Sequence, residues 1–179
     1  DSVYNQDCAL INKKFDNSGT DMLSIIVEGS QDEMVEEPAV MKRIDLYERF
    51  ITSKYPDLVG GTQSIAKIVK TLNKEFHEGD VRYFTIPDDK RLITNLMFFY
   101  AMGGDPSDYT TYVEARYRHT IIRVFLKDHK GETLEKVIAA TDEFFKSQPE
   151  IKNMKFRYAA GYGGILAGTN EEVRSAQTG

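Results

Sequence analysis

Three histidines and one cysteine are the side chains of this sequence best suited to metal binding or thiol chemistry. His77, His119 and His129 are too scattered to form a metal-binding pair on one helix, and each stands beside polar or charged residues. We interpret them as solvated or structural histidines. Cys8 is the only cysteine, so it can form neither an internal disulfide nor a zinc site built on paired cysteines. We therefore predict no metal site.

Serine, glycine and acidic residues offer no catalytic pattern either. A hydrolase nucleophile elbow needs a serine between two glycines in the local motif, and the serines here do not supply it. The glycine-rich stretch from Ala160 to Gly168 lacks the Lys and the following Ser or Thr of a phosphate-binding loop, and it lacks the dinucleotide spacing. Adjacent acidic pairs, such as Glu36 with Glu37, are typical of solvated loops and first helical turns. We expect no enzyme activity and no cofactor.

Composition limits the class of protein. The chain has 179 residues, of which 41% are hydrophobic, enough to fill the core of one domain. Its net charge is -5 and no Lys or Arg cluster exceeds a pair, so we expect no nucleic-acid partner. The most apolar stretch, Leu92 to Met102, is shorter than the about 20 residues of a membrane span. Because the sequence begins with Asp1, we interpret it as a piece of a longer chain.

Apolar periodicity predicts the elements of the first half. The alternation from Met22 to Gly29 predicts a strand. An apolar helical face that opens at Pro38 predicts a helix that ends before Pro56. A weak second strand is expected near residues 57–61, and Thr62 is the expected cap of the next helix.

The second half is predicted with the same rules. Residues from His119 to Asp128 alternate and predict a strand, and Thr133 is the expected cap of an amphipathic helix that stops at Pro149. Alternation resumes at Met154 and predicts a last strand.

The predicted order is strand, helix, weak strand, inserted helices, strand, helix, strand. We predict a helical insertion at about 80–116. The remaining elements have the order of the split βαβ unit of a ferredoxin-like sandwich, an α+β fold with two helices on one face of an antiparallel sheet. The predicted core comprises Leu23, Ile25, Val27, Ile44, Ile122, Val124, Leu126, Leu134, Ile138 and Phe156.

The insertion is apolar on more sides than one packing face can bury. We expect Leu92, Leu96, Phe99 and Tyr100 to face the domain core. The candidate substrate or interdomain surface then consists of Tyr83, Phe84, Met97, Phe98 and Met102. The alternative is that the insertion is ordinary core, packed on the domain itself.

Several segments, in order along nearly the whole chain, resemble the first large extracytoplasmic loop of exporters of the resistance-nodulation-division (RND) superfamily. The similarity is to the branch with MMPL, hydrophobe-amphiphile and hopanoid-type lipid transporters. Its first part is the stretch from Phe15 to Gly29, with Gly19 and Asp21 before the apolar run. The other matching residues are Ser64, Ile65, Ala66, Ile68, Val69, Lys70 and Asn73, then Tyr83, Phe84, Ile86, Pro87, Asp88, Leu92, Ile93, Leu96 and Tyr100, then Gly104, Asp105 and Pro106, and the tail from Gly161 to Val173.

The resemblance implies a porter domain between the first two membrane helices of a proton-driven exporter. Residues 1–21 would lead in from a membrane helix, 22–168 would form the porter-like domain, and 169–179 would lead to the next membrane helix. Its implied partners are the membrane domain and second porter domain of the same full-length chain and a hydrophobic or lipid-like substrate. The formation of a homo-oligomer is left as an open alternative. The implied location is the cell membrane, with this domain extracytoplasmic. The alternative is a stand-alone ferredoxin-like protein-binding or regulatory module.

Overall fold

The computed structural model describes residues 22–103, 113 and 116–160, with side chains as far as Arg157. The predicted lead-in at 1–21, which includes Cys8, the glycine-rich stretch beyond Ala160 and the exit at 169–179 lie outside the described residues. The elements are β1 (Met22–Gly29), the short 3-10 helix η1 (Met34–Glu36), α2 (Pro38–Lys54), β2 (Val59–Gln63), α3 (Ile65–Glu75), the 3-10 helix η2 (Val81–Tyr83), α4 (Lys90–Gly103), β3 (His119–Leu126), α6 (Gly131–Ser147) and β4 (Met154–Ala160).

Four strands form one antiparallel sheet in the order β2-β3-β1-β4. The central pair sets Ile25 of β1 opposite Ile122 of β3, and Val27 lies opposite Phe156 on the other side of β1. This order and these directions are those of the split βαβ unit, in which each helix connects two strands that flank a third. The predicted ferredoxin-like α+β fold is therefore confirmed.

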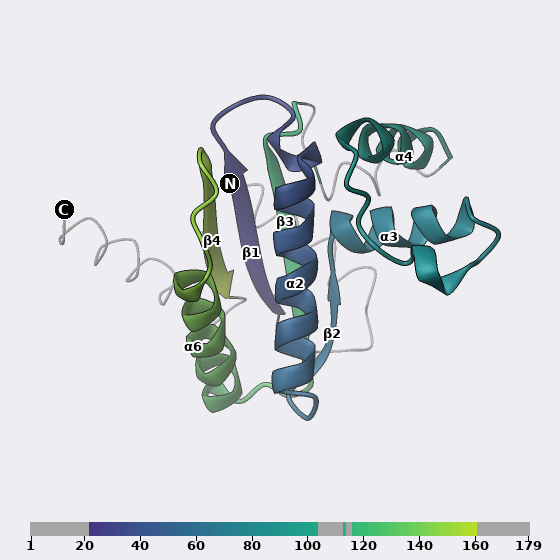
Figure 1. The fold of residues 1–179 in the computed structure, drawn as a ribbon. Coiled ribbons are helices and arrows are strands. Elements are labelled where there is room, and N and C mark those ends of the chain that lie inside the picture. The colour runs from purple at the N-terminus through teal and green to yellow at the C-terminus, as the bar shows by residue number, and fades with distance from the viewer. Residues whose placement is uncertain (1–21, 104–112, 114–115, 161–179) are drawn as a thin grey trace.

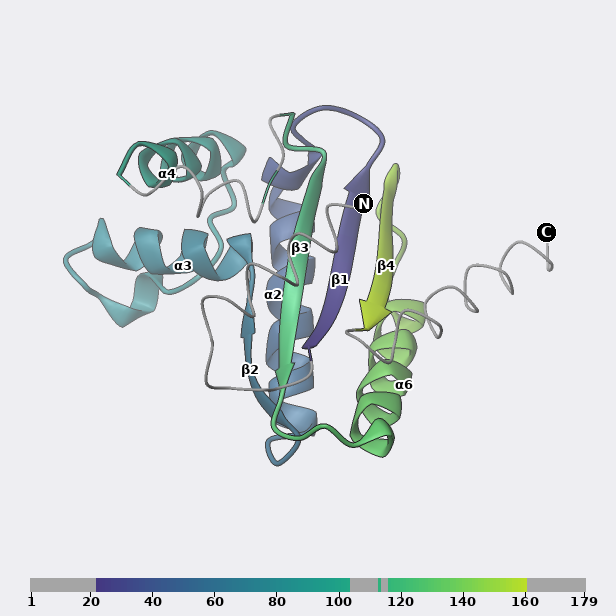
Figure 2. The ribbon, with the colours of Figure 1, turned by 180° about the vertical axis from the view of Figure 1, so that it is seen from behind.

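Helices α2 and α6 cover one face of the sheet, while α3 and α4 lie together beyond its β2 edge (Figures 1 and 2). Pro38 occupies the first turn of α2, where a missing N–H costs nothing. The Tyr47 ring of α2 packs 5.5 Å from that of Phe144 on α6, and its hydroxyl lies 2.7 Å from the Thr141 hydroxyl. These contacts fix the two covering helices against each other.

The helix starts differ from the predicted ones. Ser64, not Thr62, caps α3, because its hydroxyl accepts from the Lys67 N–H at 3.2 Å, and β2 extends to Gln63. Helix α6 begins at Gly131, before Thr133. The connection between β2 and β3 thus starts at Ser64, and α3 belongs to it together with α4.

The predicted core is mostly confirmed. Seven of its residues are buried, on β1, α2 and β3: Leu23, Ile25, Val27, Ile44, Ile122, Val124 and Leu126. The other three, Leu134, Ile138 and Phe156, are only partly buried and pack against the edge of this core. They lie on α6 and on β4, the strand at one edge of the sheet.

Candidate functional site

Helix α4 carries two apolar faces. Ile93, Leu96 and Met97 form the buried one, at the i, i+3, i+4 spacing of a helix stripe. Phe98 and Phe99 are 59% and 52% exposed on the other. Met97 was predicted to be part of the functional surface and Phe99 part of the core, and both predictions are wrong. Helix α4 is rotated about its axis relative to the prediction, so that Ile93 rather than Phe99 completes the buried stripe.

An aromatic patch consisting of Phe76, Phe98, Phe99 and Met102 lies on α4 and the C-terminal end of α3. The Phe76 and Phe99 ring centroids are 5.2 Å apart, and those of Phe98 and Phe99 are 6.3 Å apart. Met102, one turn after Phe98, is 69% exposed. In the described part of the chain, every exposed large hydrophobic residue except Leu46 lies between Phe76 and Met102. The exposed apolar surface is therefore concentrated on one insertion.

Tyr83 and Phe84, the remaining predicted site residues, are partly exposed and pack on α3. The Tyr83 ring stacks on His77 with 3.6 Å between centroids, and Phe84 lies under the Lys70 ammonium at 4.3 Å. The Asn73 amide donates to the Tyr83 carbonyl at 2.9 Å. These contacts hold η2 and the following loop against α3. The predicted role of Tyr83 and Phe84 in substrate binding stays a prediction.

Polar contacts anchor the N-terminal half of α4 to the body of the domain. The Thr94 hydroxyl donates to the buried Glu36 carboxylate at 2.8 Å, and Lys90 pairs with Glu37 at 2.8 Å. Burial raises the pKa of Glu36, although the Thr94 hydrogen bond opposes this. Helix α4 is thus fixed at one end while the aromatic patch occupies the other.

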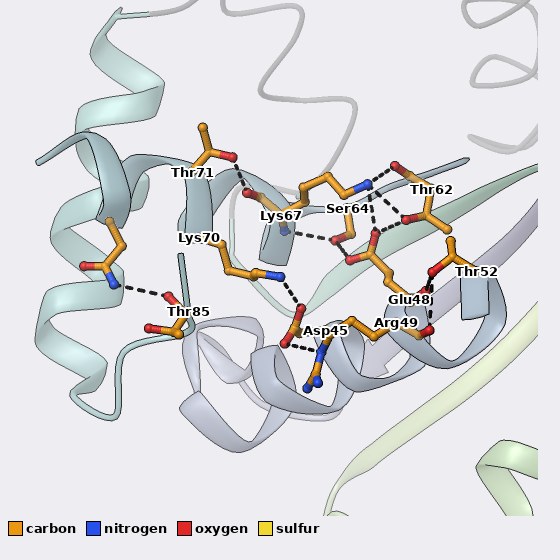
Figure 3. A network of polar contacts seen from close by, with 11 residues as sticks. Asp45, Glu48, Arg49, Thr52, Thr62, Ser64, Lys67, Lys70, Thr71 and Thr85 are labelled. Carbon is orange, nitrogen blue, oxygen red and sulfur yellow. Dashed lines mark hydrogen bonds and ion pairs between the residues drawn. The ribbon is translucent and has the colours of Figure 1, made fainter. Parts of the chain in front are cut away.

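A second polar cluster joins α2, β2 and α3 (Figure 3). The Glu48 carboxylate, only 5% exposed, accepts hydrogen bonds from Thr62 at 2.5 Å and from Ser64. The Lys67 ammonium donates to the Thr62 carbonyl at 2.6 Å and lies 3.9 Å from Glu48 Oε2. The pKa of Glu48 is raised above its ordinary value, because burial outweighs the opposing effects of the two hydroxyl hydrogen bonds and of Lys67. On α3, Lys70 pairs with Asp45 of α2 at 2.7 Å.

Sequence reasoning missed this cluster, although a signal was present. Glu48 stands on the same helical stripe as Ile44 and Ile51, where a charged residue needs a partner. The partners come from β2 and the α3 cap, the part of the chain where the strand was predicted only weakly. The cluster has a structural role, because the Glu48 carboxylate binds the hydroxyls of Thr62 and Ser64 and lies near Lys67, and these contacts join three elements.

A pocket of about 300 Å³ opens between α3 and α4. We call it the α3–α4 pocket. Its lining residues are Gln63, Ser64, Lys67, Ile68, Thr71, Leu72 and Tyr100.

No protein-family model matches the sequence, and no curated protein matches it either. Within the described ranges, no helix is both long and apolar enough to cross a membrane. The same ranges hold no group of three or more His, Cys, Asp or Glu side chains placed to bind a metal ion.

Proposed function

We propose that this chain is an extracytoplasmic porter domain of a proton-driven RND exporter, and that the aromatic patch is the surface it offers to a hydrophobic or lipid-like substrate. The observation that carries the proposal is the concentration of exposed rings on the α3–α4 insertion. Soluble monomers rarely expose a continuous apolar patch without a ligand or partner for it. The ferredoxin-like fold with an insertion and the resemblance of ordered sequence segments support the same assignment.

The patch suits a ligand of variable shape. Aromatic rings supply a large contact area, and the flexible Met102 side chain adapts to different apolar groups. Burying one such side chain contributes about 1.5 to 3 kcal/mol, so two or three of them together provide substantial affinity. Because Thr94 and Lys90 anchor α4, the patch is presented on a fixed support.

The domain acts as a passive conduit in this proposal. Proton movement takes place in the membrane domain of the same full-length chain, and a second porter domain completes the substrate path. The cell membrane is then its location, with these residues on the extracytoplasmic side. The rival proposal, a stand-alone regulatory module, assigns the same patch to a protein partner, because aromatic residues and Met are also enriched in protein interfaces.

The first experiment is to sequence the full gene. The exporter proposal expects apolar segments of about 20 residues directly before Asp1 and just after Gly179. If neither segment is present, the stand-alone module replaces the exporter.

The second experiment measures transport by the full-length protein. Phe98→Ser should lower export of a hydrophobic substrate about tenfold or more, because it removes one anchoring side chain. Leu46→Ser is the matched control: Leu46 is also an exposed apolar residue but lies on α2, away from the insertion. Unchanged export by Phe98→Ser, at equal amounts of protein in the membrane, would exclude the patch from the substrate path.

A further inference from the structure

The apolar stripe of helix α3 is only partly covered by the rest of the domain. Ile65, Ala66 and Val69 are buried against the domain. Ile68 and Leu72 are only partly buried and line the α3–α4 pocket. Ile65, Ile68, Val69 and Leu72 follow the i, i+3, i+4, i+7 spacing of a single stripe, and its Ile68 and Leu72 flank leaves apolar surface that a ligand can cover.

The pocket combines an apolar wall with one cationic end. Ile68 and Leu72 supply one side and Tyr100 of α4 the other, and a volume of about 300 Å³ is at the lower end of known ligand sites. Among the described residues, Lys67 is the only charged one that lines it. Thr71 turns its hydroxyl to the Lys67 carbonyl oxygen at 2.8 Å, so this hydroxyl is already satisfied within the helix.

The charge of Lys67 is only partly compensated. Two of its hydrogen bonds go to Thr62, to the carbonyl at 2.6 Å and to the hydroxyl at 3.1 Å, while an ammonium has three donors. The nearest carboxylate, Glu48, is 3.9 Å away and accepts instead from Thr62 and Ser64. The Lys67 side chain is 46% exposed, so a further anion can approach it. Figure 3 shows this ammonium at the β2 end of α3.

We propose that the α3–α4 pocket binds an anionic amphiphile, an aliphatic carboxylate whose head group pairs with Lys67 and whose chain lies between Ile68, Leu72 and Tyr100. The charge at one end and the apolar wall beyond it match the two parts of such a ligand. This site is separate from the aromatic patch, and its test does not depend on transport, so it can fail or succeed independently of the proposed function.

The test compares octanoate, octanol and octyltrimethylammonium as probes of the full chain. Binding is followed through the amide chemical shifts of α3 by NMR. We expect saturable shifts with octanoate, a Kd at least tenfold higher for octanol and no saturable shifts with the cation. Equal affinity for octanoate and octanol overturns the proposal. The absence of a saturable shift with octanoate also overturns it, including the case in which another segment of this chain occupies the pocket.

Variants locate the site. Lys67→Gln should raise the octanoate Kd about tenfold, equivalent to about 1.4 kcal/mol, and leave octanol binding unchanged. Lys74→Gln removes the same charge from the same helix but outside the pocket, and should leave both unchanged. Equal weakening by the two variants would mean that octanoate responds only to surface charge. If Lys67→Gln does not fold, Thr71→Trp is the alternative variant, because Thr71 is exposed at the rim of the pocket and a large ring can be placed there. The ring should block the binding of both octanoate and octanol. Undiminished octanoate binding by Thr71→Trp contradicts the proposal.

Discussion

At the scale of single residues, Glu48 shows how a buried charge is accommodated. An ionised carboxylate in the interior costs free energy unless hydrogen bonds and a cation offset the loss of water. Thr62, Ser64 and Lys67 supply these contacts, and Ser64 also caps α3. One carboxylate thereby ties α2 to β2 and to the first turn of α3.

The pKa of Glu48 predicts a specific pH dependence of stability. Burial raises this pKa above its ordinary value of 4.5, so the folded state holds the proton more tightly than the unfolded state. The contribution of Glu48 to the free energy of unfolding is then largest below about pH 4.5 and declines as the pH rises through the folded-state pKa. Glu48→Gln does not titrate there. In urea unfolding experiments, the free energy of unfolding of the wild type minus that of the variant should fall as the pH rises above about 4.5. A difference that grows with pH contradicts the assigned direction.

Some residue roles could be predicted from the sequence and others could not. Strand alternation placed Leu23, Ile25 and Val27 correctly, because a period of two leaves only two faces to choose between. Met97 and Phe99 exchanged their predicted places, because α4 is apolar on most sides and periodicity alone does not define its rotation. The pocket around Lys67 was missed because it depends on how α3 and α4 pack together.

At the scale of elements, α4 combines a core helix with a surface helix. Its buried stripe packs on the domain, and its exposed stripe forms most of the aromatic patch. The strong elements were predictable from long periodic runs, as in α6. The strand β2 was predicted only weakly, because its Gly60 and Gly61 give it little β propensity and its pairing with β3 is irregular there.

The two faces of α4 should respond in opposite ways to the same kind of change. Ile93→Ser removes a fully buried side chain and should cost about 2 to 5 kcal/mol in the free energy of unfolding, since it leaves a cavity and an unpaired hydroxyl. Phe98→Ser should change it by about 0.5 kcal/mol or less, because Phe98 is largely exposed. Urea unfolding of the two variants measures both values. A large loss with Phe98→Ser would make the insertion ordinary core and remove the basis for a functional patch.

At the scale of the whole molecule, the sheet order brings distant segments together around β3. This strand pairs with β1 on one side and with β2 on the other, although the insertion of α3 and α4 separates β2 from β3 along the chain. The insertion therefore connects the edge strand β2 to the central strand β3, and it lies beyond the β2 edge of the sheet (Figures 1 and 2). Its own contacts, through Glu36, Glu37 and Asp45, fix it on η1 and α2.

A carboxylate at the centre of the sheet should unfold the domain. Val124 on β3 is fully buried and lies opposite Leu23 of β1 and Thr62 of β2, so Val124→Asp introduces a carboxylate into the core. The cost is several kcal/mol, comparable with the about 5 to 15 kcal/mol that stabilise a whole domain. Val81→Asp makes the same chemical change at a position that is 76% exposed, and it should leave the melting temperature nearly unchanged. Circular dichroism with thermal unfolding compares the two variants. If Val124→Asp melts at the same temperature as the wild type, the sheet does not pack as the structure places it. If only Val124→Asp loses its cooperative unfolding transition, the central strands are essential to the stability of the fold.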